Sequence, residues 1–105
     1  MGIGPDGHLL SIFPGSAAFD ARGWVVSVPA PTHVAPNVAR VSLTPGALDA
    51  TPALVPMAFG AGKAAILASV LAGPRDERRL PAQRASRAGA TWILDAAAAG
   101  MLPRP

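Results

Sequence analysis

Short apolar runs rich in β-branched residues recur along the chain, with proline or glycine at or near the ends of each. Two of these runs, Trp24–Val28 and Val38–Thr44, have the composition and length of strands. Two more predict strands at Ala53–Phe59 and Ala90–Leu94. Pro56 lies inside the third run and has no N–H to donate to a ladder, which indicates an edge strand or a bulge there.

The clearest helical pattern covers Lys63–Ala72, preceded by a glycine turn and ended by a Gly-Pro pair. Its larger apolar side chains share one face at helical spacing: Ile66, Leu67, Val70 and Leu71. Thr44 followed by Pro45 is typical of an N-cap with proline at the first helical position, so we expect a short helix there. Asp95 is expected to cap the alanine run at 96–99.

Strands that alternate with helices and glycine-rich strand-to-helix turns predict an α/β fold with a mostly parallel sheet. A chain of 105 residues is long enough for one small domain. In such sheets ligands bind at the carboxyl ends of the strands, where the glycine turns lie. The search for a site therefore begins at those turns.

Composition excludes several classes of protein. Half of the residues are hydrophobic and 14% are charged, which is not the balance of a disordered chain. There is no cysteine, so disulfide and thiol chemistry are excluded. The longest apolar run, Ala64–Ala72, is far shorter than the roughly 20 residues that span a bilayer, and we expect no membrane segment. The opening residues lack the pattern of a secretory signal, so we expect a cytoplasmic protein.

The net charge of +3 raises the question of nucleic-acid binding, because several arginines fall within residues 74–87. Asp76 and Glu77 interrupt these arginines, and no aromatic residue lies among them for base stacking. We therefore expect a solvated loop and helix surface rather than a nucleic-acid site.

Candidate chemistry is concentrated in residues 2–8, where three glycines, an acid and a histidine occur together. Glycines let the backbone approach a ligand closely, and Asp6 stands two residues before His8, where a carboxylate can orient an imidazole. That pairing indicates general-base catalysis. The alternative is a flexible amino-terminal segment with an exposed histidine. The segment is not a dinucleotide fingerprint, because no strand precedes it.

These residues resemble the signature of the 6-phosphogluconolactonase family, within the glucosamine/galactosamine-6-phosphate isomerase superfamily. The resemblance starts with Gly2-Ile3-Gly4-Pro5-Asp6-Gly7-His8 and continues through Ser11-Ile12-Phe13-Pro14-Gly15. Further blocks follow in family order: Ala30-Pro31-Thr32, Arg40-Val41-Ser42-Leu43-Thr44-Pro45, Gly60-Ala61-Gly62-Lys63-Ala64, Gly73-Pro74, Leu80-Pro81-Ala82-Gln83 and Thr91-Trp92-Ile93-Leu94-Asp95. The resemblance covers essentially the whole chain.

The resemblance implies that residues 1–105 form the carboxy-terminal part of a three-layer Rossmann-like domain with a mostly parallel sheet. The family's amino-terminal half, with its phosphate loop, has no counterpart here, and we expect this piece alone to be inactive. The implied activity is hydrolysis of 6-phospho-D-glucono-1,5-lactone to 6-phosphogluconate in the oxidative pentose phosphate pathway. The resemblance implies a monomer when full length, with no cofactor or metal.

The resemblance also assigns roles to residues. His8 is expected to activate water, Asp6 to orient His8, and the turn around Gly4 and Gly7 to contact the substrate through its backbone. Lys63, the only lysine, is expected to bind the phosphate, although a lone lysine at a helix start is also common on a plain surface.

Two further basic side chains have weaker assignments. Arg40 is expected either to face the phosphate or to be a charge at the end of a strand. His33 is expected to be an ordinary residue of the proline linker Pro29–Pro36.

Two alternatives to the lactonase remain. One is a non-catalytic remnant or truncated gene product. The other is a sugar-phosphate isomerase like the glucosamine-6-phosphate deaminases, which share the glycine turn. In those enzymes a phenylalanine, asparagine and glutamate series follows the turn, whereas this chain has Ser11-Ile12-Phe13-Pro14 and lacks that glutamate. The lactonase is therefore favoured.

Overall fold

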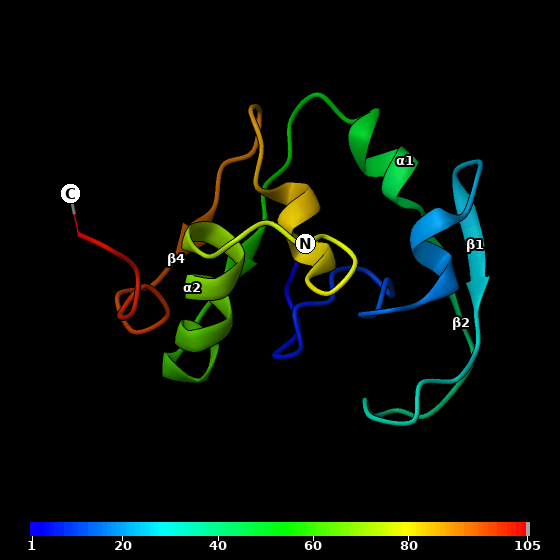
Figure 1. The fold of residues 1–105 in the computed structure, drawn as a ribbon, viewed down its shortest axis with the longest axis horizontal. Coiled ribbons are helices and arrows are strands. Elements are labelled where there is room, and N and C mark those ends of the chain that lie inside the picture. Colours follow the sequence, from blue (N-terminus) through cyan, green and yellow to red (C-terminus); the bar gives the residue numbers. More distant parts are fainter. Residues whose placement is uncertain (105) are drawn as a thin grey trace.

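The computed structural model describes residues 1–104. Figure 1 shows the β1–β2 pair and α2 toward opposite ends of the long axis, with the amino-terminal segment between them. Three short 3₁₀ helices, η1 to η3, complete the fold. In chain order the elements are η1 (Ala17–Asp20), β1 (Val25–Val28), β2 (Arg40–Leu43), α1 (Pro45–Asp49), β3 (Met57–Ala58), η2 (Ala61–Lys63), α2 (Ala64–Ala72), η3 (Pro81–Ala85) and β4 (Ile93–Leu94).

The α/β class expected from the sequence is confirmed, since strands alternate with helices and one strand pair is parallel. In that pair Met57 of β3 stands opposite Ile93 of β4. The other pair, β1 with β2, is antiparallel. The connection over residues 29–39 explains this, because parallel neighbours need a crossover of a dozen or more residues, usually with a helix.

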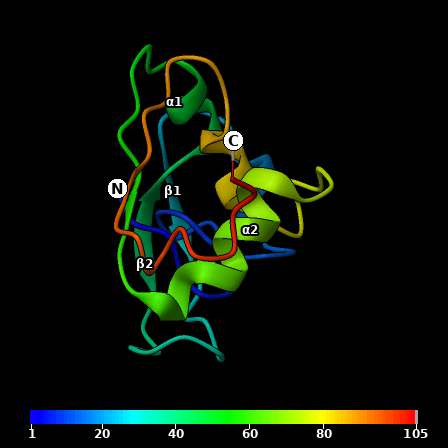
Figure 2. The same ribbon diagram turned by 90° about the vertical axis from the view of Figure 1, so that its left-hand side faces the viewer.

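Strands β3 and β4 are both shorter than the sequence predicts. Pro56 contributes only its carbonyl, which accepts from the backbone N–H of Ile93 at 2.9 Å. Before it, Leu54 makes an isolated parallel bridge with Ala90. The missing N–H of Pro56 therefore divides the expected strand into a bridge and a two-residue ladder. Figure 2 shows α2 on one side of the extended segment that leads into β3.

Both predicted helices are present. Thr44 caps α1: its hydroxyl oxygen accepts from the N–H of Ala47 at 3.1 Å and donates to the carbonyl of Gly23 at 2.6 Å. In α2, Leu67 and Val70 are buried as the spacing predicts. Further along the chain, the Asp95 carboxylate accepts from the backbone N–H of Ala98 at 2.8 Å, so its predicted capping role is confirmed.

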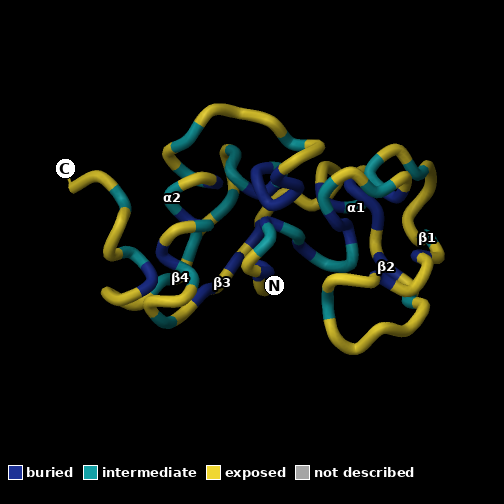
Figure 3. The backbone as a smooth tube through the Cα atoms, turned by 60° about the horizontal axis from the view of Figure 1, so that its bottom comes forward, coloured by how far each residue is buried: buried dark blue, intermediate teal, exposed yellow. Residues whose placement is uncertain are grey.

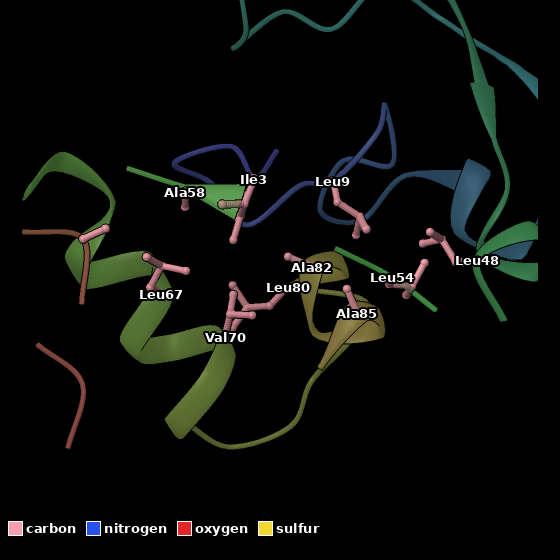
Figure 4. Close-up of a cluster of buried hydrophobic side chains, with 11 residues drawn as sticks. Ile3, Leu9, Leu48, Leu54, Ala58, Leu67, Val70, Leu80, Ala82 and Ala85 are labelled. Carbon is pink, nitrogen blue, oxygen red and sulfur yellow. The ribbon is translucent and has the colours of Figure 1, made fainter. Parts of the chain in front are cut away.

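The larger hydrophobic core joins the amino-terminal segment to α2, η3 and the strand β3. Figure 3 shows buried stretches of backbone in the middle of the molecule, and Figure 4 shows the side chains of this core in close-up. Its buried members are Ile3, Leu9, Leu48, Leu54, Ala58, Leu67, Val70, Leu80, Ala82, Ala85 and Ala98. Ile3 and Leu9 lie on either side of the glycine turn. Burial of these two side chains therefore anchors the turn to the core.

The solvated surface expected for the arginines of residues 74–87 is present at Arg75, Arg78 and Arg79, which are exposed, but the segment also packs inward. Leu80 is buried, as are all the residues of η3 except Arg84. Gln83 is only 1% exposed, and its amide accepts from the N–H of Asp76 at 2.7 Å and donates to the carbonyl of Pro74 at 2.9 Å. The polar sequence of this segment gave no sign that Gln83 is buried, because its hydrogen-bond partners are supplied by the folded loop that precedes it.

Candidate active site

The glycine turn closes on itself through backbone hydrogen bonds. The N–H of Gly4 donates to the carbonyl of His8 at 2.9 Å, and the N–H of Gly7 donates to the carbonyl of Gly4 at 3.0 Å. Gly7 has a φ of +90°, and a Cβ there would stand 2.7 Å from Cδ2 of Leu80. A glycine is therefore required at position 7 both by the backbone conformation and by the core beneath it.

The turn is held from both sides by other elements. The carbonyl of Met1 accepts from the N–H of Met57 in β3, and the carbonyl of Gly7 accepts from the N–H of Ala82 in η3, both at 2.8 Å. These bonds join segments more than 50 residues apart in the sequence. The alternative of a flexible amino-terminal segment is therefore wrong, because the turn is built into the fold.

Asp6 and His8 form a close pair in this turn. Oδ1 of Asp6 accepts from the backbone N–H of His8 at 3.1 Å and is also bonded to the ring Nδ1 of His8. The side chains of His8 and Asp6 are 15% and 23% exposed, so the pair is largely screened from water. The Asp6–His8 interaction expected from the sequence is present.

The carboxyl of Asp6 is held in its ionised form. Partial burial raises its pKa, but hydrogen bonds from the His8 backbone and from the imidazoles of His33 and His8 outweigh burial, so the pKa lies below its ordinary value. An ionised carboxylate only accepts hydrogen bonds, so Nδ1 of a neutral His8 must carry the proton. The lone pair of His8 is then on Nε2, where a general base requires it.

A hollow of about 470 Å³ lies beside His8. Gly4, His8 and Lys63 all line it, and they are three of the residues that the sequence analysis assigned to the site. Gly7 and Arg40 lie outside its described lining. The fold thus brings Lys63 to the same hollow as His8, although the two residues are 55 positions apart in the sequence.

Lys63 is held in place at both ends of its side chain. Its backbone is the N-cap of α2, and its ammonium group donates to the carbonyl of Ile3 in the glycine turn. The Asp95 carboxylate accepts from the N–H of Gly60 at 3.0 and 3.1 Å and fixes the turn that leads into the helix. Hydrogen bonds from the backbone N–H groups of Ala98 and Gly60 lower the pKa of Asp95, so the carboxylate is ionised and the bond to Gly60 is charge-assisted.

Arg40 lies outside the described lining of the hollow and packs against Phe13. Its guanidinium stands 5.4 Å from the centroid of the Phe13 ring and donates to the carbonyl of Pro36 at 2.9 Å. Its Nε is buried and has no hydrogen-bond partner within residues 1–104. Arg40 therefore stands at the end of a strand, as one of the two expectations has it, and its side chain packs against the linker and an aromatic ring.

A second histidine, which the sequence did not assign to the site, contacts Asp6. His33, expected to be an ordinary linker residue, directs Nε2 to Oδ2 of Asp6 at a distance of 2.8 Å. Its ring also stands edge-on to Phe13, with centroids 5.5 Å apart. No local pattern signals this contact, because Asp6 and His33 are 27 positions apart and the linker between strands has no periodicity.

The part of the chain that the structure describes contains no group of three side chains able to hold a metal ion. Over the same residues, no helix combines the length and apolar character needed to cross a membrane. The site thus consists of Asp6 and His8 on the glycine turn, His33 from the linker and Lys63 from the start of α2.

Comparison with known proteins shows the family of this chain. The family described as glucosamine-6-phosphate isomerases/6-phosphogluconolactonase matches residues 1–93, and the chain belongs to that family. The rat 6-phosphogluconolactonase is 40% identical over 107 residues, which cover 100% of this chain and 40% of the rat protein. The chain thus spans about two fifths of the length of this relative.

Two solved structures place the fold within the family. A 6-phosphogluconolactonase from Trypanosoma brucei has a TM-score of 0.80 at 29% identity, covering 97% of this chain and 40% of that one. A monomeric glucosamine-6-phosphate deaminase has a TM-score of 0.66 at 26% identity, covering 95% and 45%. Both members share the fold, and the lactonase is the more similar of the two.

Proposed function

We propose that this chain carries the catalytic turn of a 6-phosphogluconolactonase, which hydrolyses a phosphorylated sugar lactone to the open-chain acid. The observation that carries the proposal is the oriented Asp6–His8 pair facing the same hollow as Lys63. The identity to the rat lactonase over the whole chain supports it. A cytoplasmic location and a monomeric enzyme go with the proposal, and cell fractionation and sedimentation test them.

His8 is the general base of the proposed reaction. Its Nε2 takes a proton from water as the water oxygen bonds to the lactone carbonyl carbon, and the carbonyl oxygen becomes an oxyanion. When the oxyanion collapses, the bond between that carbon and the ring oxygen breaks. The imidazolium of His8 then returns its proton to the leaving oxygen. Asp6 stabilises the transient positive charge and keeps Nδ1 protonated throughout.

Lys63 is the phosphate-binding residue in this proposal. Its ammonium group is already fixed at the wall of the hollow by Ile3, so little side-chain entropy is lost when an anion binds. The N-terminus of α2 adds a favourable partial charge for an anion at that place. Arg40 remains a candidate second cation, although it lies outside the described lining of the hollow.

Gly4 contacts the substrate as bare backbone, because it lines the hollow directly under the His8 ring. Gly7 joins the turn to η3, because its carbonyl accepts from the N–H of Ala82. The N–H groups of both glycines are engaged inside the turn, so neither is free to stabilise the oxyanion. That role needs other donors.

The deaminase is a second candidate, because a deaminase of this family shares the fold. An assay with both substrates separates the two functions. The chain is tested alone and in a chimera in which it replaces the matched 107-residue region of the rat lactonase. We expect the chimera to hydrolyse 6-phosphogluconolactone above the spontaneous rate. Deamination of glucosamine 6-phosphate, or no activity with either substrate, would overturn the proposal.

A further inference from the structure

One carboxylate in this protein holds two imidazoles, and they are the only two histidines of the chain. Oδ1 of Asp6 is bonded to Nδ1 of His8, and Oδ2 of Asp6 lies 2.8 Å from Nε2 of His33. The Phe13 ring packs against both imidazoles: its centroid is 4.7 Å from that of His8 and 5.5 Å from that of His33. The three side chains thus form a single arrangement around Asp6.

The second oxygen of Asp6 matters because of the way a carboxylate rotates. The terminal torsion of an aspartate is broad and roughly two-fold, so a bond to one oxygen alone fixes the plane of the group poorly. A donor on Oδ2 restrains the plane, and with it the direction in which Oδ1 meets His8. Since an ionised Asp6 can only accept, His33 must donate Nε2–H in its neutral form.

The linker that carries His33 is itself held in position. The side-chain amide of Asn37 donates to the carbonyls of Pro31 and Val34, at 2.8 and 3.1 Å. The Arg40 guanidinium donates to the carbonyl of Pro36 at 2.9 Å and stacks over Phe13. These bonds restrain residues on both sides of His33. The approach of His33 to Asp6 is therefore supported by the linker and does not depend on the imidazole contact alone.

We infer that His33 is a positioning residue for the active site, which fixes the Asp6 carboxylate and through it the tautomer and orientation of His8. His33 lies outside the described lining of the hollow beside His8 and reaches that hollow only through Asp6 and His8. The inference depends on the proposed function only for its kinetic consequence. The hydrogen-bond arrangement is testable without any assay.

The primary test reads the two imidazoles directly by nitrogen-15 NMR of the 105-residue chain, at about pH 9, above the ordinary imidazole pKa of about 6.5. We expect opposite tautomers: Nδ1–H on His8 and Nε2–H on His33. His33→Phe keeps the ring contact with Phe13 but removes both nitrogens. It should lower the ratio of Nδ1–H to Nε2–H on His8 at least threefold, whereas His33→Gln, whose amide can donate, should preserve it.

Ala39→Ser is the control, because Ala39 is exposed in the same connection between β1 and β2. It should leave the tautomer ratio unchanged. Circular dichroism checks that each variant folds, and His33→Ala replaces His33→Phe if the latter does not. An unchanged ratio on His8 in His33→Phe, or in His33→Ala where that variant is used, would overturn the inference. So would a wild-type His33 that carries its proton on Nδ1.

Kinetics of the chimera supply the second readout. We expect His33→Phe to lower kcat about tenfold, the size of one hydrogen bond to a charged group, and to leave KM unchanged. His33→Gln should restore most of kcat. A higher KM with unchanged kcat would overturn the positioning role. If the chimera is inactive while the tautomers are as expected, the lactonase proposal fails and the inference about His33 stands.

Discussion

The imidazole of His8 lies directly against the α-carbon of Gly4. A Cβ built at Gly4 would stand 2.0 Å from Cε1 and 2.1 Å from Nδ1 of His8, well inside any real contact between carbon atoms. The ring that carries the proposed base therefore occupies the space that a side chain at position 4 would fill. Glycine at this position is a requirement of the base and not only of the backbone.

Gly4→Ala tests this relationship. The added methyl must displace the His8 ring, so in the chimera we expect lactonase kcat to fall at least 100-fold while far-ultraviolet circular dichroism stays the same. Gly2→Ala is the matched control, because nothing lies within 4 Å of a Cβ at Gly2. Equal activities of the two variants would contradict the packing argument.

His8→Ala removes the proposed base. We expect a loss of about 10²–10⁴-fold in kcat, the usual contribution of a general base, measured against the spontaneous hydrolysis of the lactone. The melting temperature reports whether the turn survives the substitution. Retention of near-wild-type turnover in a folded variant would remove His8 from the mechanism.

Lys63→Ala tests the phosphate-binding role. We expect KM for the phosphorylated lactone to rise at least tenfold with a smaller change in kcat, because in the proposed function the ammonium group binds the phosphate and takes no part in the proton transfer. Arg22→Ala removes one positive charge from an exposed position and serves as the control for net charge. If both variants raise KM equally, long-range charge and not a specific contact explains the effect.

Asp6 should make stability depend on acid. Its folded pKa is below the ordinary value of 3.8, despite the opposing effect of burial, because His8 and His33 donate hydrogen bonds to it. Its contribution is therefore fully present above about pH 4 and is lost as the pH falls through the lower folded pKa.

Melting temperatures measured between pH 5 and pH 2 test this sign. We expect the wild-type protein to lose more stability across that range than Asp6→Asn does, because the variant has no carboxyl to protonate at this position. Parallel curves for the two proteins would show that the Asp6 pKa is not shifted by folding.

Gln83→Leu tests the buried amide of η3. The substitution removes the hydrogen bonds to the N–H of Asp76 and the carbonyl of Pro74, and a typical hydrogen bond contributes about 0.5–1.5 kcal/mol to stability. We expect the free energy of unfolding in urea to fall by about 1–3 kcal/mol. Arg22→Gln, at an exposed site, should change it by less than about 0.5 kcal/mol. A neutral Gln83→Leu would show that the loop refolds around the change.

Several elements could be predicted from the sequence because short-range interactions determine them. The N-cap at Thr44 needs only a hydroxyl and the next three residues. The face of α2 follows from the spacing of Leu67 and Val70. The Asp6–His8 pair was also predictable, since two positions in a glycine turn place the carboxylate beside both the N–H and the ring of His8.

Other features were decided only by tertiary structure. The contact of His33 with Asp6, the bond from Lys63 to Ile3 and the burial of Gln83 join segments whose approach depends on how loops and core pack. Loops without periodicity carry no signal of where they end in space. Local chemistry therefore determined which residues could react. Long-range packing decided which side chains meet, as in the contact of His33 with Asp6 and the packing of Arg40 against Phe13.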